Sequence, residues 1–137
     1  MTDYLVDNSV WARLATGDPT ITTRLRRIEQ APADLFVTCP PQVLEFCHSA
    51  RTPGEHAHYR EQFSLGFPLE RAPDETLVLD IQAALRSAGL VRAAGPLDIL
   101  IAGYAIVNDA TVLAADHDFE HLARVVDLRH EYLPPSS

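Results

Sequence analysis

The sequence predicts an α/β fold in which a central parallel sheet of four to five short strands is covered by helices on both faces. Short apolar runs suited to strands alternate along the 137 residues with longer amphipathic segments suited to helices. Helix-starting signals, such as Asp18-Pro19 and Pro40-Pro41, stand at the junctions. A chain of this length suits one hydrophobic core, so we expect a single domain over residues 1–133 and a flexible tail at 134–137.

Two strands and four helices are predicted in the first half of the chain. The strands are the apolar runs at residues 3–7 and 35–39. Asn8 or Ser9 is expected to cap a short first helix, because both side chains can accept a hydrogen bond from its first turn. The three later helices are predicted at residues 18–30, 40–51 and 54–66.

The clearest helical pattern lies in the second half, at residues 74–88, where apolar residues recur every three to four positions until Gly89. Right-handed crossovers place the carboxyl ends of parallel strands at one edge of a sheet. The ends of the strands at 3–7 and 111–115 should therefore meet if these strands are neighbours. The other predicted elements are helices at 97–108 and 119–124 and strands at 111–115 and 125–128.

Acidic residues fall at the positions from which an α/β sheet builds its ligand site. Asp7 and Asp116 each end a predicted strand, and Asp118 follows Asp116 by two residues. Glu45 lies one turn into a helix, and Asp98 lies in the first turn of another. Each acid alone could merely cap a helix or face solvent, but their joint placement predicts that the carboxylates converge.

Converging carboxylates predict a divalent cation. Two carboxylates about 4 Å apart repel by roughly 4 kcal/mol at an effective dielectric constant of about 20, so a group of four needs a cation or takes up protons. Magnesium and manganese prefer oxygen ligands, and a water held by either ion can be oriented for attack on phosphorus. Ser9, two residues after Asp7, is expected to hold a ligand carboxylate in place.

The composition excludes several kinds of protein. The formal net charge is −8 and all eleven basic residues are arginine, so no lysine is present for a phosphate-binding loop, a Schiff base or a receiver-type phosphoacceptor site. The acidity disfavours non-specific binding to nucleic acid, although the charge outside four metal-binding acids is only about −4. Cys39 and Cys47 are expected to be free and buried. No membrane-spanning or signal-like stretch is found, so we expect no membrane association and a cytoplasmic location.

Two alternatives compete with a divalent-cation site built from these acids. Residues 117–121 (His-Asp-Phe-Glu-His) spell the inverted zinc-protease motif H-x-x-E-H. This motif straddles a predicted strand–helix junction rather than lying within one helix. The other alternative is a catalytically inactive module that binds RNA or protein. Such a module should have lost at least one of four acids, all of which are present here: Asp7, Glu45, Asp98 and Asp116.

The ordered set of acidic motifs resembles that of the PIN domain family. Residues 5–9 (Leu-Val-Asp-Asn-Ser) and 43–46 (Val-Leu-Glu-Phe) look like its first two acidic motifs. Residues 96–102 and 112–119 look like the remaining two, and Asn8 stands where threonine is common. The short length and the segment at residues 45–51 resemble the VapC toxins of VapBC toxin–antitoxin pairs.

The resemblance implies a PIN-like three-layer α/β/α fold and a magnesium- or manganese-dependent endoribonuclease. The implied substrates are single-stranded loops of structured RNA of the tRNA or rRNA class. The implied catalytic and metal-binding residues are Asp7, Glu45, Asp98 and Asp116, with Asp118 as a further metal ligand and Ser9 in support. The family also implies a homodimer and a VapB-like antitoxin whose C-terminal segment covers the acidic site, in a heterotetramer or larger complex.

Overall fold

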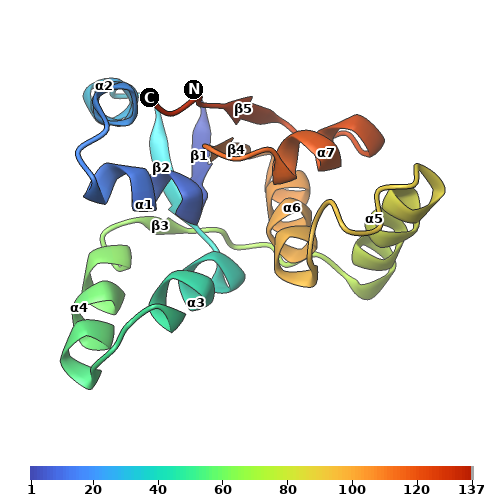
Figure 1. Ribbon diagram of the computed structural model, residues 1–137, viewed down its shortest axis with the longest axis horizontal. Coiled ribbons are helices and arrows are strands. Elements are labelled where there is room, and N and C mark those ends of the chain that lie inside the picture. The colour runs from blue at the N-terminus through green and yellow to red at the C-terminus, as the bar shows by residue number, and fades with distance from the viewer. Residues whose placement is uncertain (137) are drawn as a thin grey trace.

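The computed structural model describes residues 1–136, which form a five-stranded sheet between two layers of helices (Figure 1). The strands are β1 (Asp3–Val6), β2 (Leu35–Thr38), β3 (Phe67–Pro68), β4 (Thr111–Ala114) and β5 (His130–Tyr132). They are all parallel, and their order across the sheet is β3-β2-β1-β4-β5. The predicted α/β fold with a parallel central sheet is confirmed.

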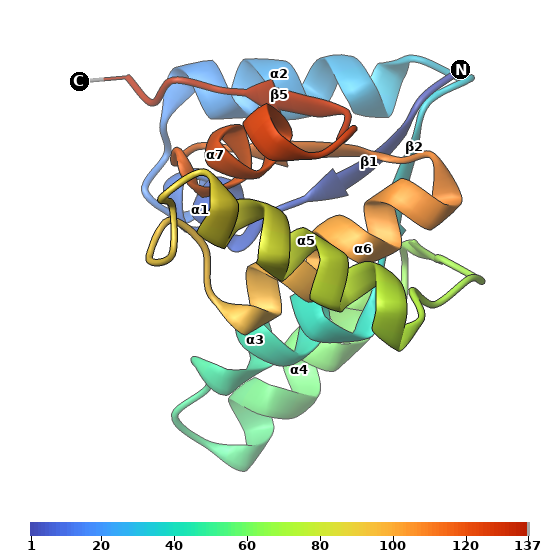
Figure 2. The ribbon, with the colours of Figure 1, turned by 90° about the vertical axis from the view of Figure 1, so that its right-hand side faces the viewer.

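Helices connect the strands and cover both faces of the sheet. Residues 1–136 contain α1 (Asn8–Ala15), α2 (Pro19–Gln30), α3 (Pro40–His48), α4 (Pro53–Phe63), α5 (Glu75–Ser87), α6 (Pro96–Asn108) and α7 (Asp118–Val125). In Figure 1, α1 and α2 lie on one side of the sheet, and α5, α6 and α7 lie on the other. Helix α5 packs on α6, as Figure 2 shows, while α3 and α4 pack together below the sheet.

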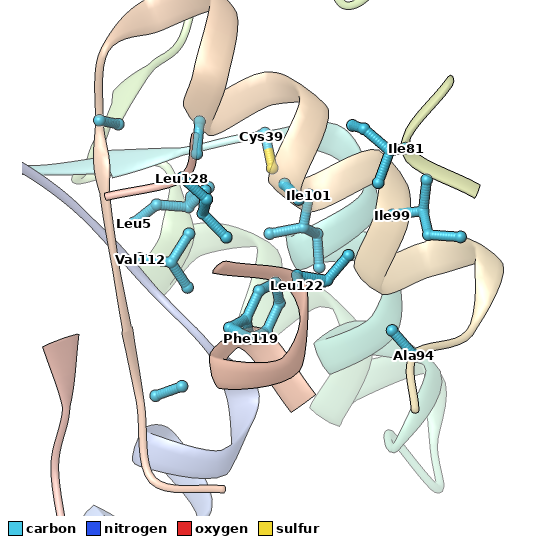
Figure 3. Close-up of a cluster of buried hydrophobic side chains, with 14 of the residues drawn as sticks. Leu5, Cys39, Ile81, Ala94, Ile99, Ile101, Val112, Phe119, Leu122 and Leu128 are labelled. Carbon is cyan, nitrogen blue, oxygen red and sulfur yellow. The ribbon is translucent and has the colours of Figure 1, made fainter. Parts of the chain in front are cut away.

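Side chains of the central strand β1 point alternately to the two faces, as expected of a strand covered on both sides. Tyr4 and Val6 pack with Ile21 of α2 in one cluster. Leu5 packs on the opposite face with Phe119 of α7, in the cluster that Figure 3 shows. The alternation fixes the register of β1, because a shift by one residue would exchange the two faces.

The last strand lies later in the chain than predicted. The sequence predicts a strand at residues 125–128, but Val125 ends α7 and Leu128 is buried in the core. The strand that pairs with β4 is His130–Tyr132, with His130 opposite Val112. Because β5 lies at the edge of the sheet, it can be polar and carries no alternating apolar pattern that sequence analysis could detect.

Three smaller differences concern element ends. Strand β3 is not predicted, since it has two residues, one of them a proline, and lies at the other edge of the sheet. Helix α3 ends at His48 rather than near residue 51, because Pro53 already begins α4 and disfavours helix just before it. The cap of α1 is Asp7, not Asn8 or Ser9.

The strand order reverses its direction at one place. From β1 the chain moves outward to β2 and β3, then returns to the other side of β1 as β4 and β5. The carboxyl ends of β1 and β4 therefore flank a topological switch point, where open α/β sheets bind their ligands. Val6, the last residue of β1, lies opposite Leu113, and β4 ends one residue later at Ala114.

The C-terminal segment returns to α2. The Ser136 N–H donates to Asp18 Oδ2 (2.8 Å), and the Ser136 and Thr20 hydroxyl oxygens lie 2.6 Å apart. The flexibility of the tail at 134–137 stays a prediction, and Ser137 lies outside the described residues. Within residues 1–136, every helix is too short or too polar to cross a membrane.

Candidate active site

Asp7 lies where β1 passes into α1, beside the end of β4. Its N–H donates to the Leu113 carbonyl (2.9 Å), which continues the β1–β4 hydrogen bonding by one step. The residue is only 5% exposed, and its carboxylate caps α1 by accepting a hydrogen bond from the Ser9 N–H (3.1 Å). The Ser9 hydroxyl accepts a hydrogen bond from the Ala115 N–H (2.9 Å). This bond ties α1 to the segment that leads to Asp116.

Glu45 reaches the same place from α3. Its carboxylate accepts a hydrogen bond from Asn8 Nδ2 (2.9 Å), which links α3 to the start of α1. One turn earlier, the side chain of Gln42 is buried. Its amide donates to the Val6 carbonyl at the end of β1, and its Oε1 accepts from the Cys39 N–H (3.3 Å). Gln42 thus fixes α3 against the end of β1, and so places Glu45 at the carboxyl edge of the sheet.

Asp98 lies in the first turn of α6, as predicted. Its Oδ2 accepts a long hydrogen bond from the N–H of Gly95, the residue that precedes the helix (3.4 Å). The free N–H groups and the dipole of the helix start favour a charged carboxylate here. The next residue, Ile99, is buried in the core, which holds this turn of the helix against the protein.

Asp116 and Asp118 lie between β4 and α7. Asp116 follows the buried end of β4 by two residues, and Asp118 is the first residue of α7. Asp116 Oδ1 accepts a hydrogen bond from the Asp118 N–H (3.2 Å). This bond orders the turn and keeps both carboxylates on the same short loop. Phe119, fully buried, fixes the start of α7.

The structure brings the five predicted acids into one electrostatic cluster, which we call the acidic site (Asp7, Glu45, Asp98, Asp116 and Asp118). Burial raises the pKa of Asp98 to about 7, and repulsion from Asp118 and Asp7 adds to the effect. Burial also raises the pKa of Asp7, against hydrogen bonds from Ser9, with a further rise from Asp116 and Glu45. Burial and repulsion from Asp116 raise the pKa of Asp118.

The donor set of the acidic site fits a hard cation. It consists of carboxylate oxygens, which magnesium and manganese prefer. Asn8 Oδ1, next to Asp7 in the chain and on the side chain that binds Glu45, is buried without a hydrogen-bond partner in residues 1–136. Within the same residues no three acidic, histidine or cysteine side chains are close enough to hold one ion directly. These side chains do not form a ligand shell as placed, and the fit to a hard cation rests on the oxygen donors of the acidic site.

The zinc-protease motif is not assembled. His117 precedes α7, and its side chain is 62% exposed and bound through Nδ1 to Glu120 Oε2 (2.6 Å). His121 lies inside the helix. A zinc site of this type needs both histidines on one helix face, and the described residues hold no such group of ligands. Cys39 and Cys47 are free and buried, as predicted.

Sequence reasoning missed two residues that build the site. Gln42 belongs by sequence to the polar face of its helix, yet it is buried and holds α3 to β1. The available signal was its position as the third residue of a helix that starts Pro40-Pro41, where a glutamine can bond back to the helix start. Asn8 is the second, and only its long-range bond to Glu45 reveals its role.

Comparison with known proteins identifies the family. Residues 4–125 match the PIN domain, and this span contains all five acids. The chain belongs to the PIN domain family. In this PIN domain, the acids predicted from sequence come from four separate segments, and Asp7 and Asp116 follow the two strands that flank the switch point, β1 and β4. No curated protein matches the chain.

Solved structures share the fold of this PIN domain. One is VapBC2 from Rickettsia felis bound to a promoter DNA fragment, with a TM-score of 0.72, 15% identity, and coverage of 96% of this chain and 98% of that chain. Another is VapBC-1 from nontypeable Haemophilus influenzae, with a TM-score of 0.72, 18% identity, and coverage of 96% and 98%. DNA-bound VapBC from Salmonella typhimurium has a TM-score of 0.68, 18% identity, and coverage of 97% and 99%.

Proposed function

We propose that this PIN domain is a divalent-metal-dependent endoribonuclease of the VapC toxin type, which cuts single-stranded loops of structured RNA of the tRNA or rRNA class. The observation that carries the proposal is the placement of the five acids in the fold. Asp7 and Asp116 follow the neighbouring strands β1 and β4, Glu45 binds Asn8 beside Asp7, and Asp98 and Asp118 lie in the first turns of α6 and α7. Family membership supports a nuclease, and the similarity in fold to chains of VapBC complexes supports the toxin type.

Asp7, Glu45, Asp98 and Asp116 would hold magnesium or manganese, with Asp118 as a further ligand. When bound, such a cation activates water and offsets the charge that develops on the phosphodiester. Two features of the acidic site bear on how a cation would bind there. Burial and the neighbouring carboxylates raise the pKa of Asp98 to about 7, and a bound cation would favour its ionised form. The hydrogen bond from Asn8 orients the Glu45 carboxylate.

The same charge arrangement supports an antitoxin partner. An acidic site on a chain of net charge −8 attracts a basic side chain. We therefore propose a VapB-like antitoxin whose C-terminal segment presents arginine or lysine to the acidic site and blocks access of RNA. A homodimer, joined with the antitoxin in a heterotetramer or larger complex, is part of the same proposal. Co-expression with a VapB-like antitoxin should suppress RNA cleavage, and unchanged cleavage by the purified complex would argue against inhibition.

The test of the activity is cleavage of total RNA by the purified, partner-free chain. We expect discrete fragments with added manganese, none with EDTA, and none with Asp98→Asn. Asp80→Asn is the matched control, because Asp80 is an exposed aspartate on α5. Fragments that persist in EDTA or with Asp98→Asn would contradict the proposal. A folded protein that binds RNA without cutting it would instead favour the inactive binding module.

A further inference from the structure

An exposed histidine ring, stacked on a partly buried tyrosine, lies next to the acidic site in the chain. The imidazole of His117 lies on the phenol ring of Tyr132, with ring centroids 4.6 Å apart and ring planes inclined by 24°. The other aromatic pairs within residues 1–136 are tilted or edge-on. This pair is therefore the single parallel stack in the described part of the chain, and it lies where the loop of Asp116 and Asp118 leaves β4.

Its position follows from the backbone. Tyr132 is the cross-strand partner of Ala114, the last residue of β4. His117 directly follows Asp116 and precedes the first turn of α7. The pair therefore joins β5 to the loop of Asp116 and Asp118, which belong to the acidic site.

The stack on Tyr132 does not enclose the ring of His117. The ring is fixed in its plane by the bond from Nδ1 to Glu120 Oε2 (2.6 Å), and Tyr132 covers one face. The side chain nevertheless remains 62% exposed. A structural stack that only tied β5 to α7 would not need an exposed ring. The arrangement holds a flat surface in a set orientation and leaves it accessible.

The chemistry of the surroundings indicates what this surface takes. Asp116 and Asp118 flank His117 in the chain, and Glu120 binds its ring, so nearby carboxylates disfavour a phosphate group on the ring itself. A nucleobase carries no charge, and bases of single-stranded RNA stack on aromatic side chains, including histidine. A base on the face of His117 opposite Tyr132 would extend the Tyr132–His117 stack and bring its neighbouring phosphate to the acidic site.

We propose that His117, backed by Tyr132, is a base-stacking platform that positions one nucleotide beside the scissile phosphate of a single-stranded RNA. This inference rests on the proposed ribonuclease activity and adds a substrate-binding residue to it. It assigns no proton transfer to His117. The platform would contribute to substrate affinity and to the choice of cleavage site, but not to the chemical step.

The experiment compares variants on a short RNA hairpin that carries a cleavage site mapped with the wild-type protein. His117→Ser removes the ring and keeps a residue suited to the start of α7. His117→Phe keeps a ring that can stack. His56→Ala is the matched control, because His56 is an exposed histidine on α4, outside the acidic site. Thermal unfolding checks that all variants are folded.

We expect His117→Ser to raise KM about tenfold, the size of one lost base-stacking contact, with kcat nearly unchanged and with weaker preference for the nucleotide next to the cut. His117→Phe should keep KM near the wild-type value. A fluorescent 2-aminopurine base at that nucleotide reports stacking directly, and the Asp98→Asn background prevents cleavage during the measurement. The fluorescence of this base should be quenched on binding when residue 117 is histidine or phenylalanine, but not when it is serine.

Three results would overturn the platform. KM and cleavage site could be unchanged in His117→Ser, or His117→Phe could lose as much affinity as His117→Ser, or both variants could lose kcat at constant KM. Absence of cleavage by the wild-type protein would instead overturn the proposed ribonuclease, and the platform with it.

Discussion

Replacing Asp98 by asparagine should stabilise the metal-free protein while abolishing its activity. The pKa of Asp98 rises from 3.8 to about 7 on folding. At about 1.4 kcal/mol per pKa unit, this rise corresponds to about 4 kcal/mol of destabilisation once the folded protein carries the charge. Asp98 is partly exposed and shares its repulsion with neighbours, so we expect about half, roughly 2 kcal/mol. The substituted asparagine keeps an oxygen that can accept from the Gly95 N–H, so little stability is lost in exchange.

The stability difference between the wild type and Asp98→Asn should depend on pH, because the pKa of Asp98 differs between the unfolded and the folded state. Below a pH of about 4, the Asp98 carboxyl is uncharged in both states and the penalty is absent. Between pH 4 and 7 the unfolded chain releases the proton and the folded protein retains it, so the penalty grows. Above pH 7 it is complete. The advantage of Asp98→Asn should therefore be below about 1 kcal/mol at pH 5 and about 2 kcal/mol at pH 8.

Urea unfolding of both proteins in EDTA, at pH 5 and pH 8, measures this difference. The corresponding rise in Tm at pH 8 is roughly 4–8 °C. Asp80→Asn on the exposed face of α5 should show no such trend with pH. A stability difference that does not change between the two pH values, or a large loss of stability at pH 8, would refute the electrostatic reasoning and make Asp98 a structural residue.

Four further variants, at three residues, test other parts of the site. Glu45→Gln keeps an oxygen for Asn8 but removes a charge, so cleavage should need more manganese; an unchanged manganese titration would remove Glu45 from the site. Asp7→Asn and Asp7→Ala should both be inactive. Only alanine removes the cap of α1, so only Asp7→Ala should lower the free energy of unfolding, by about 1–2 kcal/mol in urea. Equal stabilities of the two variants would contradict the capping role. Gln42→Leu leaves the Val6 carbonyl without its hydrogen-bond donor and should lower the free energy of unfolding by about 1–3 kcal/mol. An unchanged urea midpoint would show that this hydrogen bond does not hold α3 against β1.

The acidic site could be predicted because its residues follow strong local signals. Asp7 and Asp116 come directly after buried apolar runs, and parallel topology alone brings such ends together. Asp98 follows Gly95-Pro96, which marks a helix start. These signals depend on a few consecutive residues, so a single sequence contains them.

The parts that sequence analysis missed depend on distant partners. Strand β5 is polar and becomes a strand only because β4 offers an open edge. The burial of Gln42 depends on the Val6 carbonyl, 36 positions away, and the position of Glu45 depends on Asn8, 37 positions away. No local pattern encodes these pairs. The stack of His117 on Tyr132 is of the same kind, since it arises from the β4–β5 register.

The central claim is that the five acids form one cation site, and direct binding of Mn²⁺ tests it most closely. Electron paramagnetic resonance of free Mn²⁺ can count the ions bound by the wild-type protein at pH 8, by Asp98→Asn and Asp116→Asn, and by Asp80→Asn as control. We predict one or two bound ions for the wild type and for Asp80→Asn, and at least tenfold weaker binding for the other two. Equal binding by all four proteins would contradict the claim.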